Sequence, residues 1–183
     1  MRFLLPVALL ILSPLPAQAE FGLHAGGDIE VGAMGTSTAT VYESRTMGAF
    51  GLQLMPGYRT MGKTLLLGLM LNLRFHSQLS SGTTAEFSGR SFLLGPAAAL
   101  EFTKVKLLVG WDIRARHSAK LTTSYSGSGL RFLVGYRFAP SISADLHLIT
   151  TKYKTRYIGE EETNISDDPI KSTMVGIGLS LSY

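Results

Sequence analysis

Apolar residues alternate with polar or small residues through most of the chain, and this period of two constrains the fold more than any other feature. A strand points successive side chains to opposite faces, so the alternation predicts β-strands with one apolar face each. Clusters of Gly, Ser, Thr and Asn separate the segments. The eight predicted strands are Phe21–Met34, Met47–Arg59, Thr64–His76, Ser91–Phe102, Val105–Arg116, Gly129–Phe138, Ser141–Tyr153 and Ser172–Tyr183.

The segments between these strands alternate between long and short. The second, fourth and sixth connections are the short sequences TMGK, TK and AP, whereas the odd-numbered connections are several times longer. In an antiparallel meander all odd connections lie at one end and all even connections at the other. Short turns at one end and longer loops at the other are typical of transmembrane β-barrels, whose short turns are periplasmic.

Within each predicted strand the charged residues fall on one face only. The third strand, for example, sets Leu65, Leu67 and Leu69 against the face that carries Arg74 and His76. The charged faces are also rich in Gly and Ala, which weaken a strand facing water but leave room for neighbours in a narrow lumen. Arg or Lys facing lipid at mid-membrane costs about 2–4 kcal/mol. The pattern therefore favours a barrel with charges inside, although a soluble periplasmic lipocalin-like barrel has the same alternation.

Aromatic residues cluster towards the predicted strand ends, as in the interfacial girdles of membrane barrels. At the short-turn end they are Phe21, Tyr58, Phe102, Phe138 and Tyr183, and towards the other end Phe75, Phe92 and Trp111.

The first residues combine a positive charge at Arg2, an apolar stretch and small residues at Ala17 and Ala19. This layout predicts a secretory signal peptide over residues 1–19, cleaved after Ala19, and one barrel domain over residues 20–183. The longest later apolar run, Thr64–Leu73, is about half the length of a membrane-spanning helix. Cysteine is absent, which excludes disulfides, a thiol nucleophile and lipidation at a cysteine. The dispersed charges indicate no nucleic-acid surface.

The last strand places Val175, Ile177, Leu179, Leu181 and Tyr183 on one face. With the preceding features, it resembles the small eight-stranded outer-membrane β-barrel proteins of Gram-negative bacteria, of the OmpA-barrel and OmpX type. The resemblance implies an all-β, antiparallel up-and-down transmembrane barrel in the outer membrane. It also implies that these five residues form a C-terminal signal for the barrel-assembly machinery. Lipid neighbours including lipopolysaccharide and a monomeric state are further implications, and no motif identifies a subfamily.

The interior-facing positions predict a polar network. Eight strands enclose a space that side chains can fill, so the opposite charges should pair into a plug, with an ion path as the alternative. The predicted members are Asp28, Glu30, Arg59, Arg74, Glu101, Lys106, Asp112, Arg114, Arg116, Arg131, Arg137 and Asp145.

Two other groups of residues contain side chains of the kinds found in catalytic or metal sites. The sequence Arg116-His117-Ser118 resembles part of the Ser-His-acid arrangement of outer-membrane lipid A deacylases, but the Ser directly follows the His and no acid follows until Asp145. Adjacent strand residues point to opposite faces, which disfavours a His–Ser hydrogen bond. The acidic residues from Glu160 to Asp168 do not match the spacing of a calcium loop. We therefore expect no catalytic, metal or cofactor site.

The sequence thus predicts an integral outer-membrane barrel with a filled polar interior. Its expected role is structural or surface interaction through four outer loops. The alternatives are a narrow pore for a small solute and an outer-leaflet lipid-modifying hydrolase.

Overall fold

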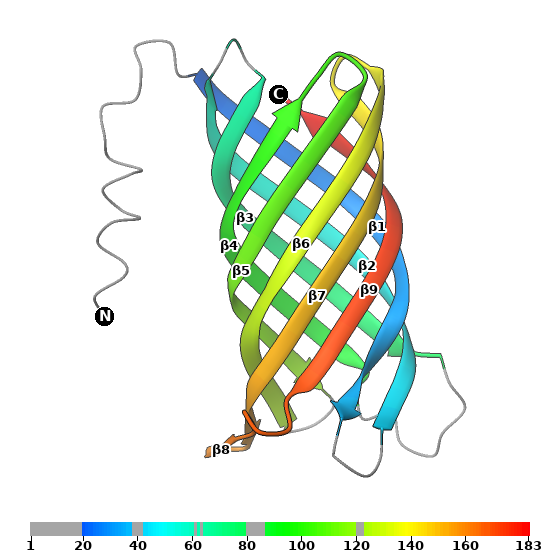
Figure 1. The fold of residues 1–183 in the computed structure, drawn as a ribbon, viewed down its shortest axis with the longest axis vertical. Helices are drawn as coiled ribbons and strands as arrows, with labels where there is room; N and C mark the ends of the chain where they lie inside the picture. Colours follow the sequence, from blue (N-terminus) through cyan, green and yellow to red (C-terminus); the bar gives the residue numbers. More distant parts are fainter. Residues whose placement is uncertain (1–19, 38–41, 61, 63, 80–86, 120–122) are drawn as a thin grey trace.

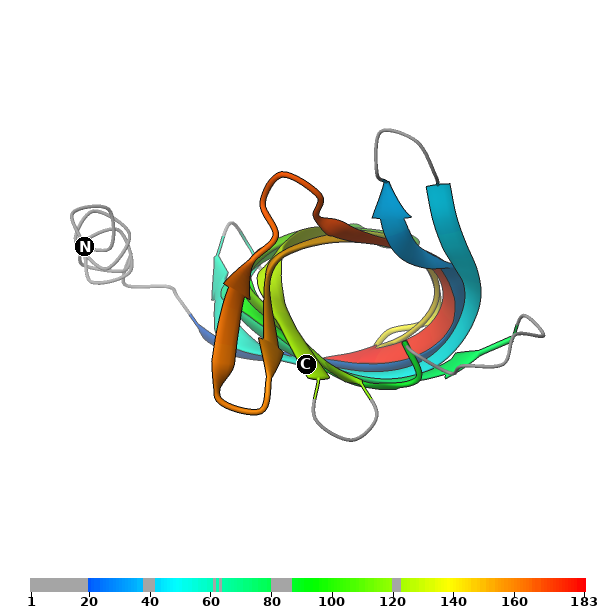
Figure 2. The same cartoon turned by 90° about the horizontal axis from the view of Figure 1, so that it is seen from below.

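The computed structural model describes residues 20–37, 42–60, 62, 64–79, 87–119 and 123–183 of the chain. They form a closed antiparallel barrel (Figures 1 and 2). The predicted signal peptide, including Ala17 and Ala19, lies outside the described residues. Among the described residues, no helix has the length and apolar character needed to cross a membrane.

Eight strands build the wall of the barrel and a ninth extends one hairpin beyond it. The wall strands are β1 (Glu20–Ser37), β2 (Tyr42–Thr60), β3 (Leu65–Gln78), β4 (Gly89–Glu101), β5 (Val105–Ala119), β6 (Thr123–Ala139), β7 (Ile142–Ile158) and β9 (Ile170–Ser182). The short β8 (Glu161–Asn164) pairs with the end of β7. The predicted eight-stranded antiparallel barrel is confirmed.

Pairing of the first and last wall strands closes the barrel. Ile29 of β1 lies opposite Ile177 of β9, and the register runs without interruption from His24 to Gly35 on β1. Backbone bonds between Leu23 and Tyr183, both of 2.8 Å, extend the seam to the end of the chain. Closure leaves no wall strand with an unpaired edge along this seam, which a sheet in lipid could not tolerate.

Several strands are longer than the sequence predicted, mainly at the end of the barrel with the long connections. β6 begins at Thr123 instead of Gly129, and β7 continues to Ile158 instead of Tyr153. The stretch from Thr123 to Ser128 reads as a loop because it is rich in Ser, Gly and Thr, yet it pairs with β7. Cross-strand pairing therefore overrides local preference there, and the connections at that end are shorter than expected.

The outer and inner faces of the wall are the reverse of those in a soluble protein. Ile29 and Ile177 on the outer face are 69% and 70% exposed. Arg131 and Lys106 on the inner face are 0% exposed and Arg74 is 1% exposed. The direction of the alternation, with charges inward, is as the sequence predicted.

A β-bulge in β5 breaks this alternation at one place. Asp112 pairs with Gly129 and Ala115 with Gly127, so two residues of β5 face a single residue of β6. Asp112 and Ala115 are buried inside, whereas Arg114 is exposed. The extra residue shifts the phase of everything that follows.

Because of the bulge, the predicted location of two residues is wrong. Arg114 and Arg116 were expected in the lumen, but both are exposed on the outer face, whereas His117 turns inward and is fully buried. Strict alternation along β5 gives the opposite assignment because a bulge leaves no mark in the period-two pattern.

Single cysteines test the bulge, because the chain has no cysteine of its own. We expect Arg114→Cys to react readily with a small water-soluble maleimide in the detergent-folded protein. Ala115→Cys, buried inside the barrel, should react many times more slowly. Mass spectrometry of the labelled protein measures both, and equal labelling after unfolding is the control. The reverse order of reactivity would mean that β5 keeps its simple alternation.

Candidate functional site: the barrel interior

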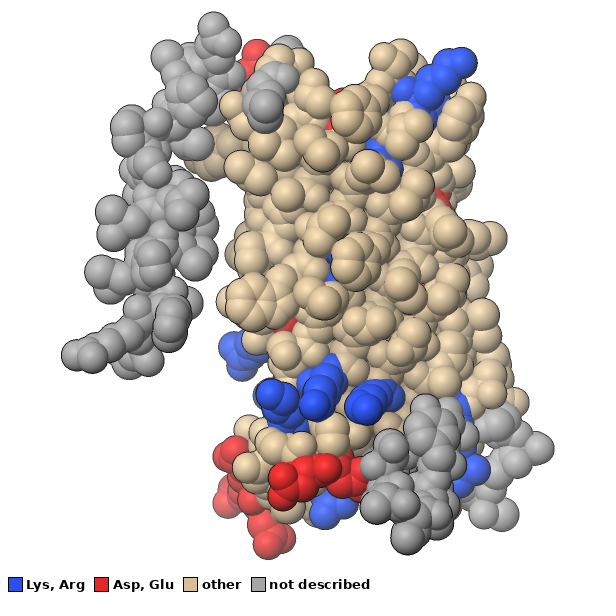
Figure 3. Space-filling model, in the orientation of Figure 1, with Lys and Arg blue, Asp and Glu red and all other residues tan. Residues whose placement is uncertain are grey.

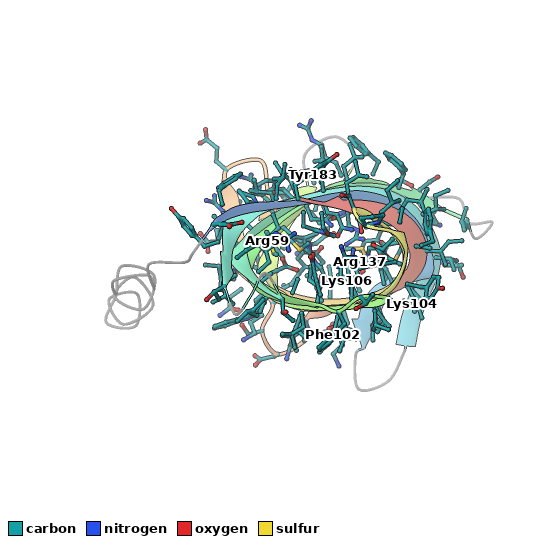
Figure 4. All side chains as sticks on the ribbon, turned by 90° about the horizontal axis from the view of Figure 1, so that it is seen from above. Arg59, Phe102, Lys104, Lys106, Arg137 and Tyr183 are labelled. Carbon is teal, nitrogen blue, oxygen red and sulfur yellow. The ribbon has the colours of Figure 1, made fainter. Side chains whose placement is uncertain are left out.

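The short-turn end of the interior is held by Arg59. Its Nη1 donates to Glu101 Oε2 on β4 at 2.6 Å, and its Nε donates to the backbone oxygen of Tyr183 at 2.7 Å. Figure 4, viewed from this end, places Arg59 and Lys106 within the ring of strands. One side chain thus ties β2 to β4 and to the end of the chain.

Arg137, another predicted interior residue, lies at the rim of this end. It is only partly buried, and its guanidinium donates to the backbone oxygens of Phe102 and Pro140. Arg137 therefore fastens the two short turns after β4 and β6 instead of pairing with an acidic residue in the interior.

Lys106 of β5 centres a second group of polar side chains. Its Nζ donates to Ser143 Oγ at 2.7 Å, to Asp145 Oδ2 at 3.1 Å and to Ser180 Oγ. Ser180 also donates to Asp145. All four side chains are buried, so Asp145 of β7 balances the charge of Lys106 and Ser180 of β9 adds a neutral hydrogen-bond partner.

Arg74 of β3 centres the third group. Its Nη2 donates to Asp28 Oδ1 at 3.2 Å and also to Glu30. Asp28 and Glu30 lie on the inner face of β1, and His147 Nδ1 is 3.8 Å from the second oxygen of Asp28. One buried guanidinium therefore joins two buried carboxylates from the strand that closes the barrel.

Arg131 and Asp112 form a fourth charged group in the interior. Arg131 Nη2 of β6 donates to Asp112 Oδ1 of β5 at 2.8 Å, and both side chains are at least 98% buried. Asp112 is the last inward residue before the bulge, so this pair also marks the place where β5 changes phase.

Glycines make room for the acidic side chains. A Cβ added at Gly51 would overlap Asp28, and one added at Gly135 would overlap Asp145. Each glycine lies directly opposite the carboxylate on the neighbouring strand, Gly51 on β2 and Gly135 on β6. Glycine in a strand costs stability, and here it vacates the space that the buried carboxylate fills.

Apolar side chains fill two further parts of the interior, to a greater extent than the expectation of a polar interior included. One cluster consists of Met55, Leu66, Met70, Ala97, Ala99, Leu108 and Leu133. The other, nearer the long connections, contains Met34, Met47, Ala49, Phe87, Leu93, Ala115, Tyr125, Tyr153, Ile170 and Met174. The interior is therefore packed with side chains of both kinds.

Two histidines and a serine meet next to the second cluster. Ser91 Oγ of β4 is 2.9 Å from His76 Nε2 and 2.8 Å from His117 Nδ1. The two imidazole rings meet edge to face at 5.2 Å, and His117 stacks on Tyr125. His117 thus bonds a serine that sequence reasoning did not connect with it, because the bulge that turns it inward was not visible.

The structure gives His117 and Ser118 different surroundings. His117 is fully buried, whereas Ser118 is only partly buried on the following, opposite-facing position. No group of three or more His, Cys, Asp or Glu side chains is placed to hold a metal ion within the described ranges.

The predicted interior residues thus divide into three sets. Nine are buried inside the barrel: Asp28, Glu30, Arg59, Arg74, Glu101, Lys106, Asp112, Arg131 and Asp145. Arg137 lies at the rim, and Arg114 and Arg116 lie outside. Polar residues without charge are also buried inside but were not among the predicted residues, such as Gln53, Asn72, Ser91, Ser143 and Ser180. Their inward phase was the available signal, since each alternates with an apolar outward residue.

The five residues of the predicted C-terminal assembly signal all face outward on the seam strand. Val175, Ile177, Leu179, Leu181 and Tyr183 are between 42% and 70% exposed. Their placement is that of any outer-face residue of the wall, and their part in assembly stays a prediction.

Known structures with a similar fold include the Neisserial surface protein A, NspA. It is 18% identical with a TM-score of 0.50, over 89% of this chain and 97% of that one. OmpT of Vibrio cholerae is 13% identical with a TM-score of 0.39, over 89% and 52% of the two chains. An outer membrane channel from Pseudomonas putida F1 is 10% identical with a TM-score of 0.37, over 92% and 97%.

The likeness to NspA supports the fold alone, because the sequence identity is low. No protein-family model matches the sequence, and a search of the curated proteins finds no match. The comparison therefore shows a barrel fold shared with a small outer-membrane protein, without an assignment to a family.

Removing Arg74 should destabilise the barrel strongly. In Arg74→Met the carboxylates of Asp28 and Glu30 remain buried without their guanidinium, which costs about 3–5 kcal/mol for a broken buried pair. Urea unfolding of the protein folded in detergent micelles, followed by Trp111 fluorescence, measures the loss.

Two further variants make this test specific. Lys104→Met removes an exposed cation on a short turn and should leave the free energy of unfolding within about 0.5 kcal/mol of the original. Adding Asp28→Asn and Glu30→Gln to Arg74→Met should recover part of the loss. Equal effects of Arg74→Met and Lys104→Met would show that the buried group contributes nothing.

Proposed function

We propose that the protein is an integral outer-membrane barrel with a closed interior, which acts as a structural or surface-interaction protein through the end with the long connections. The observation that carries this proposal is the outer face. Large apolar side chains cover it, including Ile29, Leu69, Val109, Trp111 and Ile177, each 47% exposed or more. Exposed apolar area of this extent on a monomer marks a surface meant for contact with another apolar phase.

The height of the apolar surface supports a membrane rather than a protein partner. On β7 the outward residues run from Ile142 through Leu146 and Leu148 to the first outward charge at Lys152. Ten residues at about 3.3 Å each, tilted near 45°, rise about 23 Å. An outer-membrane barrel has an apolar band of about 25 Å.

The orientation follows from the connections. Outer-membrane barrels have short periplasmic turns, so the turns after β2, β4 and β6 are placed in the periplasm together with Tyr183. Export then uses the predicted signal peptide, and the other end faces the exterior.

The packed interior supports the closed-barrel form of this proposal over a pore. Arg74, Lys106 and Arg131 have at most 1% of their surface exposed, so the described side chains leave little solvent-accessible space beside them. The apolar cluster that contains Leu66 and Leu133 fills a further part of the interior. The proposed function includes no enzymatic activity, cofactor or nucleic-acid partner.

The outer end offers an acidic hairpin as a contact surface. Glu160 lies in the turn between β7 and β8, Glu161 and Glu162 begin β8, and all three are exposed. Gly159 makes the turn with a φ of 62°, a conformation that glycine adopts without strain. A partner of this end would meet a negatively charged hairpin.

Cell fractionation and gel migration test the membrane assignment. We expect the full chain, expressed in a Gram-negative host, to sediment with the outer membrane and resist carbonate extraction. Unboiled samples should migrate differently from boiled ones, because a closed barrel stays folded in cold detergent. Recovery in the soluble periplasmic extract would overturn the assignment, and a resident porin and a soluble periplasmic protein calibrate the fractions.

Single-channel recording tests the closed interior. We expect no steady current steps after insertion of the folded protein into a planar bilayer, because buried side chains fill the lumen. An open porin inserted in the same bilayer is the positive control, and heat-modifiable migration verifies folding. Reproducible steps of constant conductance would favour the narrow-pore alternative.

A further inference from the structure

Two lysines face each other on the outside of the barrel. Lys152 of β7 lies directly opposite Lys171 of β9, and both side chains are exposed. Like charges on directly opposite strand positions destabilise a sheet. In the part of the chain that the structure describes, no carboxylate lies within 4.0 Å of either ammonium group. The pair is therefore a site of uncompensated positive charge.

The same two lysines line a groove on the outer wall. The groove has a volume of about 420 Å³, and its outward-facing lining residues include Trp111, Leu130, Thr150, Lys152, Lys171 and Thr173. Trp111 and Leu130 are 56% and 46% exposed, so they offer an apolar surface beside the two ammonium groups. A groove with a cationic part and an apolar part fits a ligand that has an anionic head and an apolar chain.

Three further cations lie on neighbouring positions of the outer face. The bulge in β5 turns Arg114 and Arg116 outward, and Lys154 is exposed on β7. Arg116 pairs with Ser126 of β6, which pairs in turn with Thr155, the residue after Lys154. Figure 3 shows Lys and Arg side chains gathered on this face near the end with the long connections, next to a broad band with almost no charge.

The level of the lysines matches a membrane boundary. Lys152 is the first outward charge on β7. It lies about 23 Å from Ile142 along the barrel axis, by the rise of a tilted strand. β9 runs in the opposite direction to β7. On its outer face, Lys171 is likewise the next outward residue beyond Val175 and Thr173 towards the end with the long connections. Lipid phosphate groups lie at the boundary of the apolar band, where a lysine meets them without entering the hydrocarbon.

We propose that this groove binds a phosphate-bearing lipid of the outer leaflet. The phosphate lies between the ammonium groups of Lys152 and Lys171, and an acyl chain runs over Leu130 and Trp111. The phosphate removes the repulsion between the lysines, while the groove shields part of the chain. This inference rests on the proposed membrane function and adds a specific lipid site to it.

Trp111 reports on the site, because it is the only tryptophan of the chain and lines the groove. The full chain is folded into phosphatidylcholine vesicles that contain a lipid brominated near the headgroup, either phosphatidic acid or phosphatidylcholine at equal mole fraction. Bromine quenches tryptophan on contact. We expect local enrichment of brominated phosphatidic acid by about fivefold or more, from the attraction of surface lysines for anionic lipid.

Two double variants separate a specific site from general charge. Lys152→Gln/Lys171→Gln should abolish the difference between the two brominated lipids. Arg90→Gln/Lys104→Gln removes two exposed cations that do not line the groove, and the difference should persist. Enrichment that is equal in both double variants, or absent from the original protein, overturns the proposal.

Two measurements keep the outcome interpretable. Heat-modifiable migration of every variant shows that the barrel is inserted, so a chain that fails to insert speaks against the membrane function and not against the lipid site. Inorganic phosphate, added to vesicles with brominated phosphatidic acid at matched ionic strength, should leave the quenching of Trp111 unchanged. Loss of quenching on addition of phosphate would overturn the lipid part of the proposal.

Discussion

The pairing of β1 with β9 is the constraint on which the rest of the structure depends. Backbone groups in an apolar phase must all be paired within the protein, and only closure pairs both edges of the sheet. Once eight strands close, the enclosed space is narrow enough for side chains to fill. Every inward residue must then fit against residues from the opposite wall. Packing of the interior and closure of the sheet therefore depend on each other.

The buried charges show how packing and closure are linked. Arg74 satisfies Asp28 and Glu30 of β1, while Lys106 satisfies Asp145 of β7 and bonds Ser180 of β9. Both cations thus bond residues of the strands at or next to the seam. Buried ion pairs contribute little net stability, but losing one partner is costly. A barrel closed in another register would leave these charges unpaired, and we infer that the network selects the register more than it adds stability.

Most of the fold was predictable from the sequence because alternation, strand length and connection length all depend on local residue order. Nine predicted interior charges are indeed buried, as their phase requires. The errors have a common cause. The extra residue before Ala115 and the pairing of Thr123 to Ser128 with β7 are set by neighbouring strands. A single strand read alone contains no information about its partner, so neither the bulge nor the longer β6 was visible. The hydrogen bonds of Ser91 with His76 and His117 were hidden for the same reason.

The bulge connects the interior with the outer surface. Before it, Asp112 pairs inside with Arg131, and after it Ala115 and His117 occupy the interior. Had the strict alternation continued, the guanidinium groups of Arg114 and Arg116 would enter a region already filled by Met34, Leu93 and Tyr153. A charge buried there would need a partner that the surrounding apolar side chains do not supply. One additional residue instead moves both arginines to the outer face, where they lie on the same wall as Lys152 and Lys171. The same local irregularity thus keeps the interior near the long connections free of unpaired charge and gives the outer face at that end its basic character.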